Sequence, residues 1–138
     1  MSDSQEDPVF GKVISMYSRR RAIEDGTLVE VPPAIAANAG IKVPVALTRA
    51  AWMGCVAWTE ADSHRQCPQD ETGRLWDVLT MFVHATRGAK NASEVQFDVL
   101  RIKRNGRDSS PTKVTLKGVI GPGDTAAPVI TIMFPTED

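Results

Sequence analysis

Residues 69–88, QDETGRLWDVLTMFVHATRG, carry the longest apolar stripe of this 138-residue chain together with its densest cluster of charges. Positions spaced three or four apart fall on one side, as in a helix that buries one face: Leu75, Trp76, Leu79, Phe82, Val83 and Thr86. Asp70 can cap the N-terminus of this helix, and Gly88 can end it in the left-handed conformation. The stretch therefore predicts one long helix on which the core is organised.

The same stretch places acids around one arginine. In the helix, Asp70, Arg74 and Asp77 lie in one row, and Glu71 stands three residues before Arg74. Two interpretations are open: exposed ion pairs worth about 0.2–0.5 kcal/mol each, or a preorganised polar site that binds a partner. A different local structure is also open, in which residues 70–73 form a tight turn, residues 74–76 a short strand, and Asp77 caps a shorter helix. We expect the longer helix.

Length, charge and cysteine content narrow the class of protein. The length fits one domain with a core of its own. Sixteen basic residues against 17 acids give a net charge of −1, which does not indicate general nucleic-acid binding and does not suit a DNA mimic. The sequence has no run of eighteen apolar residues and no signal peptide pattern, so we expect no membrane partner. With two cysteines only, we expect a reduced, cytoplasmic protein.

The N-terminal half predicts short elements. Residues 1–8 are polar and acidic and predict a disordered tail, so the single domain is expected over residues 9–138. The patterns then predict helices over 19–25, 33–38 and 49–58, a short strand over 28–31, a covering segment or edge strand over 41–47, and a surface loop over 59–68. Gly54, inside the third of these helices, predicts a close helix crossing.

After Gly88 the hydrophobic period changes from 3.6 to 2. Strands are predicted near 95–102, 113–120 and 128–134, with turns between them. A change of parity at Leu100 predicts a bulge or a strand covered on both faces. The expected fold is an α+β domain in which three to four helices pack on a C-terminal three-stranded antiparallel meander. The last strand is apolar on both faces and needs two covers, which is compatible with a homodimer through the sheet.

Basic residues gather in two places that nucleic acid could contact. One is the triplet Arg19, Arg20 and Arg21, and the other is a hairpin that carries Arg101, Lys103, Arg104, Arg107, Lys113 and Lys117. Such a hairpin can lie along a phosphate backbone, although no aromatic residue is interleaved for base stacking. A charged hairpin tip also keeps edge strands from pairing between molecules, so nucleic acid is the alternative partner rather than the first.

No motif assigns a catalytic residue, a metal or a cofactor. Cys55, His64 and Cys67 come closest to a metal site, but they provide too few ligands and only one short spacing for structural zinc. The sequence contains no phosphate-binding loop, no G-x-S-x-G and no H-E-x-x-H. A small hydrolase or transferase that uses Asp70, Glu71, Arg74 and Asp77 is a further alternative.

Five segments together resemble a known family. They are MYSRRRAIEDGTLVEV (16–31), PVALTRAAW (44–52), QDETGRLWDVL (69–79), KVTLK (113–117) and GPGDTAAPVITIMFPTED (121–138). They resemble a family of short bacterial proteins of unknown function that are carried on plasmids and other mobile elements. The resemblance implies an accessory protein that binds a host protein. Our leading hypothesis is a non-enzymatic inhibitor of host defence, of anti-restriction or anti-CRISPR type, that uses the acid and arginine row and the neighbouring tryptophan surface.

Overall fold

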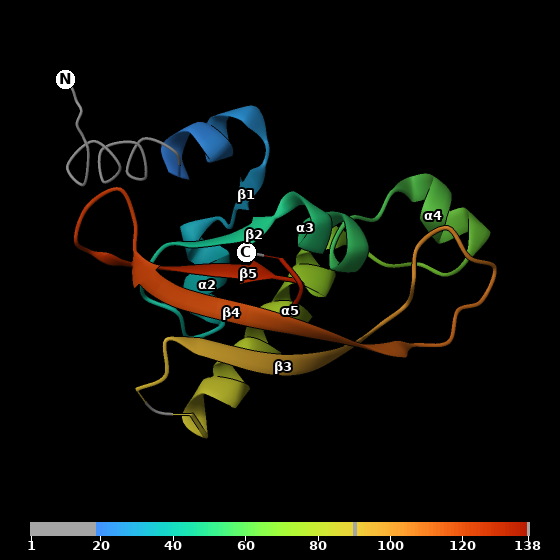
Figure 1. Cartoon of the computed structure of the whole chain (residues 1–138). Coiled ribbons are helices and arrows are strands. Elements are labelled where there is room, and N and C mark those ends of the chain that lie inside the picture. The colour runs from blue at the N-terminus through green and yellow to red at the C-terminus, as the bar shows by residue number, and fades with distance from the viewer. Residues whose placement is uncertain (1–18, 90, 138) are drawn as a thin grey trace.

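The computed structural model describes residues 19–89 and 91–137, so the expected tail at residues 1–8 lies outside the described residues. Residues 19–25 are helical. The elements that follow are β1 (Leu28–Glu30), α2 (Pro33–Asn38), β2 (Val45–Thr48), α3 (Arg49–Cys55), α4 (Glu60–Arg65), α5 (Glu71–Arg87), β3 (Glu94–Arg101), β4 (Thr112–Pro122) and β5 (Pro128–Met133), as Figure 1 shows. None of the helices among these residues is both long and apolar enough to cross a membrane.

The strands form one five-stranded mixed sheet in the order β1-β2-β5-β4-β3. The β2–β5 pair is parallel, and the other described pairs are antiparallel. The α+β class is therefore confirmed, and β3, β4 and β5 do form a meander, but the predicted three-stranded sheet was too small. β2 was expected to be an edge strand or a covering segment and is instead an inner strand. Its apolar residues 45–47 are fully buried, as a strand with neighbours on both sides requires.

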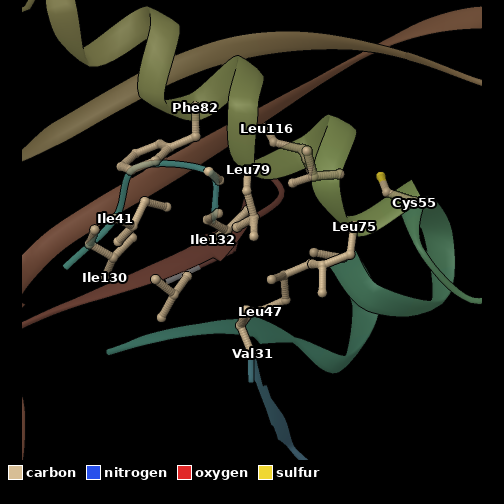
Figure 2. Packing of buried hydrophobic residues seen from close by; sticks show 14 of the residues in the cluster. Val31, Ile41, Leu47, Cys55, Leu75, Leu79, Phe82, Leu116, Ile130 and Ile132 are labelled. Atoms are coloured by element: carbon tan, nitrogen blue, oxygen red, sulfur yellow. The ribbon is translucent and has the colours of Figure 1, made fainter. Parts of the chain in front are cut away.

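The core lies between α5 and one face of the sheet (Figure 1). Leu75, Leu79 and Phe82 of α5 point toward strand residues such as Leu116 and Ile132, as Figure 2 shows. The ring of Phe82 meets the ring of Phe97 edge-on, with centroids 5.6 Å apart. It also lies directly over Gly118, where an added Cβ would come within 2.2 Å of the Phe82 ring. The Phe82 side chain of α5 thus occupies the space that a side chain at position 118 of β4 would need.

Helix α5 confirms the long-helix prediction and corrects two of its details. Oδ1 of Asp70 accepts a hydrogen bond from the Gly73 amide at 2.6 Å, so Asp70 is the N-cap. Gly88 does end the helix, but its φ of −93° is not left-handed. The side chain of Trp76 is 47% exposed, and Val78 is buried in the stripe to which Trp76 was predicted to belong. At 100° per residue, Val78 lies about 40° from Phe82 around the helix, whereas Trp76 lies about 120° from it, on the flank of the helix.

Three other predictions are corrected between α3 and β3. Gly54 does not mark a helix crossing, because a Cβ there would come within 2.9 Å of the Phe134 ring, a side chain that follows β5. The expected loop over 59–68 contains α4, a helix too short to show an apolar stripe. β3 has neither a bulge nor two covered faces: its register with β4 is continuous, buried and exposed side chains alternate along it, and Leu100 is 67% exposed.

The sheet face turned away from α5 is partly covered by the chain itself. Thr131 alternates with the core residues Ile130 and Ile132 and therefore belongs to this outer face. Nη1 of Arg19 donates to Oγ1 of Thr131 at 2.7 Å, and Nη2 donates to the Ile130 carbonyl at 3.3 Å. The helical segment over 19–25 thus packs on the outer face at β5. A homodimer through this face stays a prediction.

Candidate functional site

Arg74 points into the protein, which does not fit exposed ion pairs, the first of the two interpretations of its sequence. Its side chain is only 4% exposed. Nε donates to the Val56 carbonyl at 3.0 Å, and Nη1 donates to Oε1 of Gln69 at 2.7 Å and to the Ile102 carbonyl at 3.0 Å. The guanidinium carbon lies 4.6 Å from the centroid of the Trp58 ring. Arg74 therefore joins α5 to the chain after α3 and to the chain after β3, and the expected exposed pairs with its acidic neighbours were wrong.

The three acids of the predicted row do different things. Asp70 caps α5, and Oε2 of Glu71 accepts a hydrogen bond from the Trp58 amide at 3.1 Å. The Asp77 carboxylate makes no hydrogen bond or ion pair with any described residue. Partial burial raises the pKa of Asp77, and the positive charge of Arg74 opposes that shift. Of the three acids, Asp77 is thus the one whose carboxylate is left open to a ligand or partner.

Arg74 and Asp77 line a cavity of about 190 Å³, which we call the arginine cavity. Its other polar walls are Gln69 and Arg101, and the thiol residue Cys55 also lines it. Nε of Arg101 donates to the Gly54 carbonyl at 3.0 Å, and Nη1 donates to Oγ1 of Thr112 at 3.0 Å. Two guanidinium side chains from different elements are therefore fixed at one small cavity.

The electrostatics of this cavity favour negative charge. Nη2 of Arg74 is buried and has no hydrogen-bond partner among the described residues. Burial lowers the pKa of Arg74, and the positive charges of Arg101 and Arg104 act in the same direction, against the influence of Cys55 and Asp62. Burial raises the pKa of the Cys55 thiol, although the positive charges of Arg101 and Arg74 oppose this shift. Cys55 therefore stays a protonated thiol and a poor nucleophile at neutral pH.

Asp62 is a buried acid that sequence reasoning missed. It accepts hydrogen bonds from the Thr59 amide at 2.8 Å and from Nε of Arg104 at 2.7 Å, and it pairs with Arg65. Burial alone would raise the pKa of Asp62, but the Thr59 amide, Arg104 and the Thr59 hydroxyl outweigh it and lower the pKa to about 2. The T-x-x-D spacing of a capping box was the signal in the sequence that could have found this residue.

The basic residues do not form one surface. Arg19 lies beside the turn after β4, whereas the hairpin begins at the other end of this 11-residue strand, roughly 35 Å away (Figure 1). Within the hairpin, Arg101 and Arg104 are held by internal contacts. The exposed cations of the hairpin are Lys103 and Arg107 in the loop after β3 and Lys113 at the start of β4. Among the described residues, no group of three or more His, Cys, Asp or Glu side chains could hold a metal ion.

A groove of about 500 Å³ runs between α5 and β3, the strand at one edge of the sheet. It is lined by Asp77, Thr80 and Met81 of α5, by Asp98, Val99 and Leu100 of β3, and by Lys113. We call it the β3-edge groove. It shares Asp77, Val99 and Leu100 with the arginine cavity, so the two hollows are neighbours. Leu100 and Met81 are 67% and 40% exposed, which leaves apolar surface open to contact.

The backbone of β3 is also open at this edge. The Ile120 amide donates to the Ser93 carbonyl at 2.8 Å, which makes Ser93 and Ile120 a hydrogen-bonded pair. In an antiparallel ladder such pairs alternate with non-bonded ones, so the residues at even positions turn their amide and carbonyl groups away from β4. Asp98 and Leu100 therefore offer their backbone groups at this edge, while their side chains lie on the sheet face turned away from α5.

The chain belongs to a family of unknown function, DUF6573, whose model matches residues 9–138. No curated protein and no solved structure matches the chain. Membership in a family of unknown function, predicted from the five sequence segments, is thereby confirmed.

Proposed function

We propose that this protein is a non-enzymatic binding module that recognises an extended segment of a partner protein at the β3-edge groove. The observation that carries the proposal is the free edge of an eight-residue strand beside a groove with exposed Leu100 and Met81. When a partner adds a strand to a sheet edge, backbone hydrogen bonds supply affinity and neighbouring pockets supply specificity. The other edge strand, β1, has three residues and offers a shorter template.

The charges at the groove indicate what kind of segment fits. The Asp77 carboxylate has no partner among the described residues, whereas Asp98 accepts from the Thr115 hydroxyl at 2.6 Å and pairs with Lys113 at 3.9 Å. In an added strand, an apolar side chain on one face would pack on Leu100, and on the other face an apolar side chain would pack on Met81 with a basic side chain near Asp77. In this proposal Asp77 is the member of the predicted row that contacts the partner directly, while Asp70, Glu71 and Arg74 support it.

The mobile-element resemblance supplies the setting. We infer that the partner is a host protein in the cytoplasm and that binding inhibits host defence, of anti-restriction or anti-CRISPR type. The support for an inhibitor role is the resemblance of the sequence segments, together with a surface suited to protein contact. Plasmid establishment in a defence-proficient host tests it: the gene should raise establishment, and equal establishment with and without the gene contradicts the inhibitor role.

The docking surface is tested by site-specific photo-crosslinking in a bacterial lysate treated with nuclease. A crosslinking residue at position 100 should capture a host protein, because this position lines the groove and is exposed. The matched control is position 53, where Met53 is also exposed, at 45%, but lies on α3. Capture at both positions alike contradicts the groove. Capture that occurs only in a lysate left without nuclease favours the alternative of nucleic-acid binding through Lys103, Arg107 and Lys113.

A further inference from the structure

Arg74 is a buried cation whose hydrogen bonds with the described residues all go to uncharged oxygens. Two of these oxygens are backbone carbonyls and the third is the Gln69 amide oxygen, and Nη2 has no partner among these residues. Burial of a charged group is costly unless a counter-charge and a full set of hydrogen bonds compensate for it. The guanidinium therefore has one donor group left and a charge that its own hydrogen bonds do not neutralise.

The surroundings supply one carboxylate for two cations. Arg101 brings a second guanidinium to the arginine cavity, and Asp77 is the one carboxylate among the described residues that line it. The nearby Asp62 is already bound to Arg65 and Arg104. The cavity is thus lined by two cations and one acid, with one unused donor group on Arg74.

Size and shape narrow the ligand class. At about 190 Å³ the cavity is smaller than typical ligand pockets of roughly 300–1,000 Å³, so it suits a small group rather than a nucleotide. A carboxylate has two oxygens, one for each of the two guanidinium groups at the cavity. Asp77 opposes a doubly charged phosphate more strongly than a singly charged carboxylate, and Val99 and Pro111 provide apolar wall for a short aliphatic stem.

We propose that the arginine cavity binds a carboxylate, held between Arg74 and Arg101. The carboxylate belongs either to a free small aliphatic acid or to an acidic side chain of a segment docked in the adjoining β3-edge groove. The first source does not depend on the proposed function, and the second does. Both use the same contacts in the cavity.

The first measurement is an NMR titration of the wild-type protein with propionate, at constant ionic strength, that follows the Nε–H signals of Arg74 and Arg101. Saturable shifts of both signals are expected, and phosphate should bind more weakly. Absence of saturable shifts overturns the proposal, since Nη2 is then satisfied by water alone. Tighter binding of phosphate than of propionate also overturns it.

Variants locate the site. Arg101→Gln should weaken propionate binding by about tenfold or more, because a charge-assisted pair is lost, and Arg101→Lys should recover only part of it. Lys113→Gln is the matched control, since Lys113 lines the groove but not the arginine cavity, and it should bind as wild type. Equal binding by Arg101→Gln and wild type, with native circular dichroism, contradicts the site.

A last comparison separates the two sources. Propionate is compared with a short extended peptide that carries one glutamate, in wild type and in Met81→Asp, because Met81 lines the groove but not the arginine cavity. If the side chain of a docked segment is the source, the peptide binds more tightly than propionate, and Met81→Asp removes that advantage while leaving propionate binding intact. If a free acid is the source, peptide and propionate bind alike in both proteins. Failure of the groove therefore leaves the carboxylate site standing.

Discussion

The two halves of α5 pack against the same sheet in opposite ways. In the C-terminal half, Phe82 lies so close to β4 that the strand carries glycine at position 118. In the N-terminal half, Arg74 lies over Trp58 beside a cavity of about 190 Å³. Apolar packing is therefore tight at one end of the helix, and at the other end a charged side chain with an unused donor is buried next to the apolar Leu75.

The difference separates stability from recognition along a single helix. A core that only had to be stable would place an apolar side chain at position 74 as well, as it does at Leu79 and Phe82. Places where a protein departs from such packing are expected to be functional sites. We therefore expect the functional site at the end of α5 that carries Arg74 and Asp77, next to the open edge of β3.

The strongest challenge to the tightly packed half is Gly118→Val. Its Cβ alone would lie 2.2 Å from the Phe82 ring, so α5 must move or Phe82 must leave its position. We expect a loss of about 3 kcal/mol in the free energy of unfolding, measured by urea denaturation. Gly121→Ala on the same strand is the control, because nothing lies within 4 Å of its added Cβ. Similar stabilities for the two variants would contradict the close approach.

Arg74→Met tests the other half. The substitution keeps an apolar stem but removes the donors to the Val56 and Ile102 carbonyls, and we expect a loss of about 2 kcal/mol in urea denaturation. Propionate binding should disappear as well. Arg87→Met in the exposed last turn of α5 is the control and should change stability by less than about 0.5 kcal/mol. If Arg74→Met is as stable as the control, Arg74 does not join the three segments.

Asp98→Pro tests whether the β3 edge is open. Because the amide of Asp98 faces away from β4, its loss should cost less than about 1 kcal/mol of stability. Partner crosslinking at position 100 should nevertheless fall sharply, since a docked strand loses a hydrogen bond and meets the proline ring. Asp98→Ala, which keeps the amide, separates this effect from loss of the carboxylate. A proline variant that unfolds while the alanine variant does not would mean that this amide is bonded to β4.

The smallest expected effect is the loss of stability in acid that follows protonation of Asp62. Its pKa is lowered from 3.8 to about 2 in the folded protein, so the stabilisation is complete above pH 3.8 and is lost as the pH falls through 2. Wild type should therefore lose stability between pH 4 and 2 in thermal unfolding, and Asp62→Asn should lack this component. Glu60→Gln, an exposed neighbour on α4, should keep the wild-type profile.

Local signals in the sequence predicted local features, and long-range contacts decided the rest. Asp70 and the helical spacing predicted α5, and turn residues with period-two alternation predicted β3, β4 and β5. The burial of Arg74 was missed because its carbonyl acceptors, Val56 and Ile102, stand 18 and 28 residues away in the chain. The inner position of β2 was missed for the same reason, since its parallel neighbour is β5. The β3-edge groove exists only because the strand order leaves β3 outermost.

The strand order also has a consequence for how the sheet is made. β5 lies between β2 and β4, so without it the β1–β2 pair and the β3–β4 pair share no backbone hydrogen bonds. During synthesis, both strand pairs must wait until residues 128–133 have left the ribosome, with an open strand edge on each. A nascent chain that stalls before this point would therefore depend on chaperones, and a separate peptide carrying β5 could complete the sheet by complementation.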